Sequence, residues 1–265
     1  PSRTSRIRPV DPLGGVGWLA SVDPATAFRI LLIGRIRNAR EGDRFLYTSD
    51  GGVFGVTSGG VLAWVPGAET TMVPAHVVRA GSCFGMGPLR ARRRRMPTTQ
   101  AVGKSVRPYL PLTPLKALIS ADPALSDAVA RLSAFTTDTC IDCLSDLMIR
   151  NSEQRIAAVH LRITTTVAGG VSPDDPRGFL LGHSLIAQLC NASRDTMSRT
   201  LARLRERGCI DGGYRRLVIR DVEALRRAAT GLPRPPPRRQ RSRQLQSRLG
   251  PGGGRRACRL DGEAQ

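Results

Sequence analysis

The sequence predicts an α+β protein in which an N-terminal antiparallel β jelly-roll barrel precedes a long helix and a C-terminal winged helix-turn-helix. Three observations support this class. Residues 42–112 hold short apolar runs separated by turn residues, as in a small all-β barrel. After Asp122-Pro123, apolar residues recur at alternating three- and four-residue steps, which indicates a helix with one apolar stripe. Residues 182–229 then contain two short amphipathic helical segments, a turn and a hairpin.

A helix is expected before the barrel, over residues 12–40. Its apolar residues fall at helical spacings, and Asp23-Pro24 offers an N-cap followed by a proline at the first helical position. The strand candidates of the barrel are Phe45–Thr48, Val53–Thr57, Val61–Val65, Thr70–Val73, Val77–Arg79 and Val102–Leu110. Turns that contain glycine or proline separate them at the regular spacing of a barrel or jelly roll.

The helix that begins at Asp122-Pro123 has a narrow apolar stripe. Its members are Leu125, Val129, Leu132, Thr136, Thr139 or Cys140, Cys143 and Leu147. A stripe of this kind is typical of a helix that packs along a partner helix, so residues 122–150 form a candidate dimerisation helix. The alternative is a helix buried against its own barrel, and the pattern alone leaves both open.

Two apolar faces predict the helix pair near the C-terminus. They are Leu185, Ile186 and Leu189 on the first helix, and Met197, Leu201 and Leu204 on the second. Ser193 is the expected N-cap of the second helix. The exposed start of that helix carries polar groups that can read base edges in the major groove. Arg194 and Arg199 can each donate two bonds to guanine, and Asp195 can accept from the N4 amino group of cytosine.

Other side chains in this region are candidate contacts to the DNA backbone. Ser193, Thr196 and Ser198 lie near the N-terminus of the second helix, where backbone amides and hydroxyl groups hold phosphates. Arg215 and Arg216 lie on the predicted hairpin, which would form a wing beside the helix pair. The alternative interpretation is an ordinary helical subdomain with a solvated, charged face.

Composition narrows the function classes. The chain has 265 residues with 41 Lys+Arg against 21 Asp+Glu, a formal net charge of +20. Such a balance favours a polyanionic partner, with nucleic acid first and an anionic membrane surface second. No stretch approaches the roughly 18 consecutive apolar residues of a membrane span. No phosphate-binding loop, metal-spaced carboxylate pair or nucleophile elbow is found, so the chain is not expected to be an enzyme.

The expected compartment is the cytoplasm. No apolar secretion signal is recognised, and the six cysteines are unevenly spaced, which does not indicate a disulfide framework. The histidines are too scattered to suggest a metal site. Residues 231–265 hold nine arginines against two acidic residues and lack apolar periodicity, so they are interpreted as a disordered basic tail.

A motif in the second helix links the chain to a known family. Residues 192–199 read Ala-Ser-Arg-Asp-Thr-Met-Ser-Arg, and Gly208-Cys209-Ile210 follows. On these residues, 182–229 resembles the winged helix of the Crp/Fnr family of bacterial transcription regulators. Shorter matches to its N-terminal cyclic-nucleotide-binding-like barrel include Gly55-Val56-Thr57-Ser58-Gly59 and Gly81-Ser82-Cys83-Phe84-Gly85. The resemblance covers roughly residues 14–229.

The resemblance implies a homodimer that binds a two-fold symmetric operator on double-stranded DNA, with RNA polymerase as a further partner. Arg194, Asp195 and Arg199 match the family's base-reading positions, with aspartate where many members have glutamate. The implied organisation has a sensor barrel, a dimerisation helix, a DNA-binding domain and the basic tail. Their expected ranges are 12–121, 122–150, 151–230 and 231–265.

The phosphate-binding cassette of the family's nucleotide-binding members is altered. The residues that align with it are Phe84, Gly85, Met86 and Leu89, then Arg95 and Met96. Methionine replaces the glutamate that holds the ribose and the hydroxyl residue that holds the cyclic phosphate, so those hydrogen bonds are lost. A cyclic nucleotide is therefore not expected as a cofactor, and the effector pocket is degenerate or altered. The run of arginines at 90 and 92–95 can bind another anion or be solvated.

Further alternatives concern cysteine chemistry and the mode of binding. The chain has no cysteine before Cys83, so the ligands of the iron–sulfur cluster that some relatives use for oxygen sensing are missing. Cys140 and Cys143 lie three residues apart on the long helix, where they can be core residues or a thiol pair across a dimer. The protein can also be a non-specific nucleic-acid binder, or a ligand-sensing module whose helix pair docks a protein.

Overall fold

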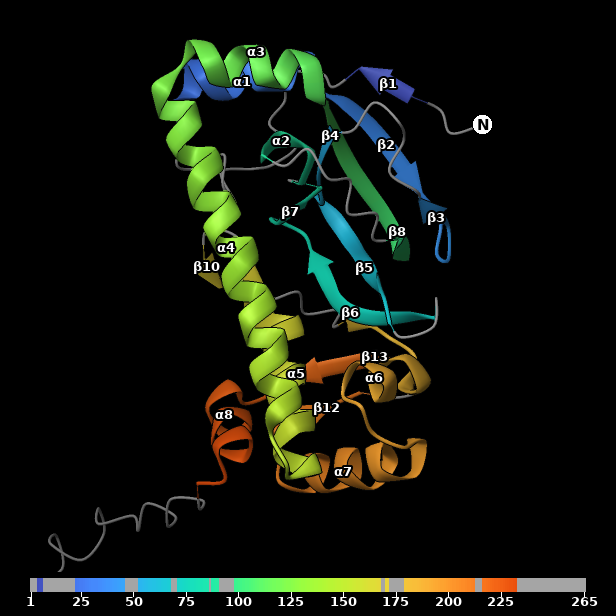
Figure 1. The fold of residues 1–265 in the computed structure, drawn as a ribbon. Coiled ribbons are helices and arrows are strands. Elements are labelled where there is room, and N and C mark those ends of the chain that lie inside the picture. Colours follow the sequence, from blue (N-terminus) through green and yellow to red (C-terminus); the bar gives the residue numbers. More distant parts are fainter. Residues whose placement is uncertain are drawn as a thin grey trace, which may run out of the picture. The chain divides into compact units, whose positions relative to one another are not determined.

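The first half of the chain is built on a curled antiparallel sheet (Figure 1). The computed structural model describes residues 4–6, 22–45, 52–67, 71–85, 87–90, 98–167, 170–171, 179–212 and 216–232. The strands of the sheet are β1 (Thr4–Arg6), β2 (Arg35–Ala39), β3 (Arg44–Phe45), β4 (Gly52–Gly55), β5 (Ser58–Pro66), β6 (Met72–Arg79), β7 (Cys83–Phe84) and β8 (Thr98–Pro111). The long strand β8 is central, because it pairs with β2, β3, β4 and β5.

The helix expected over residues 12–40 is shorter than predicted. Helix α1 spans Pro24–Ile33, and its N-cap is Asp23, as expected. Gly34 ends it with an extended backbone, and residues 35–39 then pair with β8 as strand β2. The prediction of helix is therefore wrong for residues 34–40, because one apolar residue, Ile36, fits helical and strand spacing equally well. Residues 12–21 lie outside the described part.

The six predicted strands fall, in order, on five of the eight strands of the sheet, β3, β4, β5, β6 and β8, while β1, β2 and β7 were not predicted. Thr70–Val73 and Val77–Arg79 were expected as two strands, but β6 runs unbroken through Pro74. The register between β5 and β6 shifts at Ala63/Trp64, opposite this proline, which has no N–H to donate. This β-bulge allows the strand to continue past the proline.

Helices and two smaller sheets complete the described chain. The helices after α1 are α2 (Gly87–Arg90), α3 (Leu112–Ala121), α4 (Pro123–Met148), α5 (Ser152–Thr165), α6 (His183–Leu189), α7 (Arg194–Glu206) and α8 (Val222–Thr230). The remaining strands are β9 (Thr166–Val167), β10 (Gly170–Val171), β11 (Phe179–Leu180), β12 (Ile210–Asp211) and β13 (Arg216–Ile219). β9 pairs with β10, and β13 lies between β11 and β12. The α+β class predicted from the sequence is confirmed.

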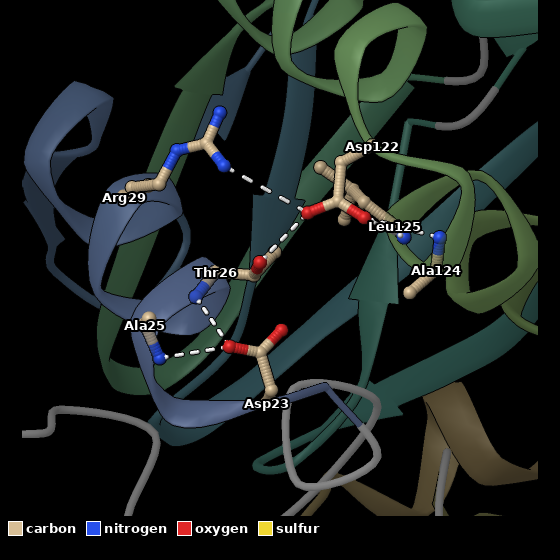
Figure 2. A network of polar contacts seen from close by, with 7 residues as sticks. All are labelled: Asp23, Ala25, Thr26, Arg29, Asp122, Ala124 and Leu125. Atoms are coloured by element: carbon tan, nitrogen blue, oxygen red, sulfur yellow. Dashed lines mark hydrogen bonds and ion pairs between the residues drawn. The ribbon is translucent and has the colours of Figure 1, made fainter.

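A network of polar contacts joins the starts of α1 and α4 (Figure 2). Asp122 caps α4 by accepting from the backbone amides of Ala124 and Leu125, at 3.0 and 3.3 Å. Its other oxygen accepts from the Thr26 hydroxyl at 2.7 Å and lies 3.8 Å from the Arg29 guanidinium. The Thr26 bond is the main reason why the pKa of Asp122 lies below its ordinary value. One aspartate therefore caps α4 and ties it to α1.

The two halves of α4 differ in their surroundings. Leu125, Val129 and Leu132 are buried in a cluster with residues of α1, α3, β4 and β8. For this half, the interpretation as a helix buried against its own barrel is correct. In the second half the exposed large apolar residues are Ile141, Leu144, Leu147 and Met148. With Ala134 and Thr137, also exposed, the residues Ile141, Leu144 and Met148 repeat at steps of three and four. This exposed stripe is offset by one residue from the predicted one.

A buried ion pair fixes the junction between α4, α5 and the sheet. Arg162 on α5 is 6% exposed, and its Nε donates to Asp146 on α4 at 2.7 Å. Its Nη1 lies 2.7 Å from Nδ1 of His76 on β6, which must accept because a guanidinium only donates. Arg79 on the same strand donates to the carbonyl of Thr164 near the end of α5. We call Asp146, Arg162 and His76 the junction triad.

Apolar contacts continue across this junction. Leu62, Val77 and Val102 from the sheet belong to the same buried cluster as residues of α5, α6 and α7. By its contacts the chain divides into residues 1–233 and 234–265. The tail interpreted as disordered lies, from residue 233 onward, outside the described part. None of the helices in the described part is long and apolar enough to span a membrane.

Candidate nucleic-acid interface

Helices α6 and α7 form the predicted helix pair. The turn between them contains Asn191 with a positive φ of 46°, and the Ala192 amide donates to the carbonyl of Ala187 at 2.9 Å. Asparagine tolerates this left-handed conformation better than most residues. All but one of the predicted apolar residues are buried; Leu185 is partly buried against the same cluster. Cys190 and Cys209 are buried there too, as expected for core residues.

The N-terminus of α7 is capped as predicted. The Ser193 hydroxyl accepts from the Thr196 amide at 3.1 Å and donates to the Thr196 hydroxyl at 2.9 Å. Because the cap is a small neutral side chain, the first turn of α7 remains open to an anion such as a DNA phosphate. The buried face of α7 consists of Met197, Thr200, Leu201 and Leu204. Its opposite face is thus directed to solvent.

The three candidate base-reading side chains are exposed together at this end of α7. Arg199 and Asp195 pair at 2.7 Å, with 65% and 76% of their side chains exposed. Arg194 donates to the Ser184 hydroxyl on α6 at 3.0 Å. An exposed ion pair contributes only about 0–1 kcal/mol. The three side chains can therefore exchange these protein partners for DNA bases at little cost in free energy.

Two further side chains hold α7 in place, and the sequence interpretation missed both. Glu153 on α5 pairs with Arg203 at 3.1 Å and with Arg207 at 2.6 Å. Arg155 donates to the carbonyls of Cys190 and Asn191, at 2.8 and 3.2 Å, and so holds the turn between α6 and α7. The residues joined lie 35–54 positions apart, so no local spacing signals these contacts. Glu153 and Arg155 are therefore positioning residues for α7 and the turn before it.

The predicted wing is present as strands β12 and β13. Ile210 pairs with Ile219 and Asp211 with Val218, while Arg220 Nε donates to Asp211 at 3.0 Å. Arg220 thereby lowers the pKa of Asp211 below its ordinary value. Of the candidate backbone contacts on the wing, Arg215 lies outside the described residues. Arg216 begins β13, and only its backbone is described.

The residues that align with the effector cassette are described only in part. Phe84 stacks on Phe54, with ring centroids 5.3 Å apart, and Gly85 has a positive φ of 90°. Leu89 packs against the cluster that contains α1, α3 and α4. Met86, Arg95 and Met96 lie outside the described residues.

The two cysteines of α4 differ in their surroundings. Cys140 is exposed, whereas burial raises the pKa of Cys143 to about 11. A thiol with so high a pKa is a poor nucleophile at neutral pH, which disfavours Cys143 as a redox sensor. Within the described residues, no group of three or more His, Cys, Asp and Glu side chains is arranged to hold a metal ion.

A curled antiparallel sheet, a long helix and a winged helix-turn-helix together define an α+β protein with a DNA-binding type of domain at its C-terminal end. Comparison with family models identifies residues 154–228 as a Crp-like helix-turn-helix domain. The described chain shares its fold with solved structures of Crp/Fnr-family regulators, and the family-model match is confined to this C-terminal domain. The family resemblance seen in the sequence is thereby confirmed.

Solved structures support the same fold. A transcriptional regulator of the CRP family from Thermus thermophilus is 20% identical with a TM-score of 0.54, over 74% of this chain and 97% of that one. FixK2 from Bradyrhizobium japonicum is 18% identical with a TM-score of 0.59, over 73% and 96%. The c-di-GMP responsive global regulator CLP from Xanthomonas campestris is 18% identical with a TM-score of 0.55, over 74% and 99%. A search of curated proteins gave no match.

Proposed function

We propose that this chain is a sequence-specific transcription regulator that binds a two-fold symmetric DNA operator as a homodimer. The observation that carries the proposal is the capped, exposed N-terminus of α7, where Arg194, Asp195 and Arg199 stand together. Such a helix start enters the major groove in helix-turn-helix proteins. Half-sites would lie about 34–36 Å apart, one turn of the double helix. By family resemblance, RNA polymerase is a further partner.

Other parts of the proposal follow from this assignment. A DNA-binding regulator acts where the DNA is, which in a bacterium is the cytoplasm. It needs no catalytic residues, so the chain is not an enzyme.

The proposed domains are the sensor barrel at 12–121, the dimerisation helix at 122–150 and the DNA-binding domain at 151–230. Ser193, Thr196, Ser198, Arg215 and Arg216 are its proposed contacts to the DNA backbone. The basic tail, 231–265, adds salt-sensitive affinity through its nine arginines.

Binding-site selection from random oligonucleotides, with the full chain at about 0.15 M salt, tests this function directly. A selected palindromic sequence supports it. The charge of +20 favours one competing function, non-specific nucleic-acid binding. In that case no sequence would be enriched, and deletion of residues 231–265 would remove most of the affinity. If no DNA is bound even at low salt, the helix pair docks a protein instead.

Replacement of either Arg194 or Arg199 by alanine is expected to weaken binding to the selected site by about 1–3 kcal/mol and to relax specificity at one base pair. The physical reason is the loss of two hydrogen bonds to one guanine. Fluorescence anisotropy on the selected site and on single-base variants measures both effects. Arg226→Ala is a matched control, because Arg226 is also exposed and paired with a neighbouring acid, Glu223, on α8. Equal weakening on all DNA sequences would contradict base reading.

The exposed stripe of α4 is the proposed dimer contact, because a second copy of the same stripe would cover its apolar residues. Leu144→Glu is expected to give monomers in sedimentation velocity, since it places two charges at an apolar seam. Leu32→Glu on α1 is the control, because Leu32 and Leu144 are both 64% exposed. A Leu144→Glu protein that stays dimeric would show that the dimer, if formed, uses another surface.

A further inference from the structure

Two arginines face each other on neighbouring strands of the sheet, apart from the recognition helix and the cassette. Arg37 on β2 is directly opposite Arg107 on β8 in the antiparallel register. Side chains at such positions lie about 4.5–5.5 Å apart at Cβ, and like charges there repel. Arg107 is only 3% exposed, whereas Arg37 is partly buried. The pair therefore places two positive charges at a largely desolvated position.

The described residues supply no counter-charge in contact with this pair. Nε of Arg37 and Nε of Arg107 are both buried without a hydrogen-bond partner, and neither guanidinium forms an ion pair with a described carboxylate. Asp43 acts on Arg107 only at longer range, and its side chain accepts from the backbone amide of Arg40. Burial, together with the charge of Arg37, lowers the pKa of Arg107 to about 10. Arg107 nevertheless remains charged at neutral pH.

Aromatic rings hold the two guanidinium groups in defined planes. The Arg37 guanidinium lies 4.4 Å from the centre of the Tyr109 ring, and that of Arg107 lies 3.4 Å from the centre of the Phe45 ring. Stacking of this kind occupies the flat face of a guanidinium and leaves its N–H edge available. That edge matches the oxygens of a phosphate or carboxylate in a two-bond contact.

The aromatic row continues beyond the arginines. Tyr109 contacts Phe54, with ring centroids 4.8 Å apart, and Phe54 stacks on Phe84. Val53 and Leu110, the strand neighbours of Phe54 and Tyr109, belong to the cluster that packs against α1, α3 and α4. Because side chains alternate between the faces of a strand, the aromatic row lies on the face away from these helices. The arginine pair shares this face, since Arg107 and Tyr109 are two residues apart.

We propose that Arg37 and Arg107 form a binding site for the phosphate group of a small molecule, with access from the partly exposed side of Arg37. A doubly charged phosphate would offset the repulsion between the guanidinium groups and satisfy the orphaned Nε–H groups. This site gives the barrel a ligand other than one held by the cassette at residues 84–96. Anion binding itself does not depend on the proposed function, but a role as effector of DNA binding rests on it.

The test uses the full chain without DNA, and inorganic phosphate and phenyl phosphate as probes. Isothermal titration and thermal melting are compared with sodium chloride at equal ionic strength. We expect saturable phosphate binding, and a weakening by about tenfold or more in Arg37→Met and in Arg107→Met. Arg37→Lys keeps the charge but loses the two-bond edge, and it should bind with intermediate affinity. Lys104→Met removes an exposed charge from the same strand as Arg107 and should leave binding unchanged.

A second readout guards against variants that bind poorly because they fold poorly. In phosphate-free buffer, Arg37→Met should melt at a higher temperature than the wild-type chain, because it removes a like-charge pair. Two results would overturn the site: wild-type chain that binds neither probe more than chloride, or a phosphate affinity that is unchanged in Arg37→Met. Tighter binding of phenyl phosphate than of inorganic phosphate would indicate an organic phosphate as the ligand. Equal affinities would indicate free phosphate. Both measurements omit DNA, so a failure of DNA recognition leaves their outcome unaffected.

Discussion

Arg162→Met is expected to lower the free energy of unfolding by about 3 kcal/mol, because breaking a buried ion pair leaves an uncompensated charge. Arg162 has 5% of its side chain exposed and its partner Asp146 has 15%. Burial already raises the pKa of Asp146, and Arg162 opposes this shift. Without the guanidinium, Asp146 must stay charged in a poorly solvated place or take up a proton. Its residual exposure keeps the cost at the lower end of the usual range.

Urea unfolding followed by circular dichroism, at one protein concentration, measures this effect. The double variant Asp146→Asn, Arg162→Met should lose less than the sum of the two single variants, since neither charge is then left alone. Arg226→Met breaks an exposed pair on α8 and should cost less than about 1 kcal/mol. Strictly additive losses at Asp146 and Arg162 would mean that the junction triad does not act as a unit.

The elements that local patterns specify were predicted well. Caps at Asp23, Asp122 and Ser193 stand at the start of α1, α4 and α7, because a short acceptor side chain before a helix satisfies amides of its first turn. The apolar face of α7 is buried as its spacing predicts. Local sequence patterns failed where strand pairing determines the secondary structure. This is the case in β2, because a single large apolar residue defines neither a helical nor a strand period.

Contacts between distant segments were beyond local patterns. The junction triad joins residues up to 86 positions apart, and Arg155 reaches the helix-turn-helix turn across 35 positions. The facing of Arg37 and Arg107 follows from the β2–β8 register, which no spacing in the sequence reveals. The stripe of α4 was predicted one residue away from the exposed one, because period alone does not show which face the chain's own sheet and helices cover. The sequence therefore located the helix-turn-helix, whereas the contacts that support it were found only in the structure.

Lowering the pH from about 6.5 to about 4 is expected to reduce the free energy of unfolding by about 1.4 kcal/mol per pH unit for His160 alone, about 3 kcal/mol in total. His160 on α5 is fully buried, and its Nδ1 lies 2.6 Å from the carbonyl oxygen of Ile156. Burial lowers its pKa from 6.5 to about 4. In this window the unfolded chain binds a proton that the folded chain excludes, so stability is complete above pH 6.5 and is lost as the pH falls.

His76 acts in the same direction, because burial, followed by the charge of Arg162, lowers its pKa to about 3. The pKa values of the capping carboxylates Asp23 and Asp122 are lowered from the ordinary aspartate value, so their contribution to the stability of the fold is lost only at more acidic pH. Urea midpoints at pH 7.5, 6.0 and 5.0 therefore lie above the range in which these caps titrate, and the comparison with a histidine variant separates the histidine from Asp146, whose pKa is raised. His160→Asn keeps an amide nitrogen near the position of Nδ1. It should reduce the slope of the free energy of unfolding against pH by the contribution of one titrating group. A slope that is the same in His160→Asn and wild-type protein would show that His160 does not exclude a proton from the fold.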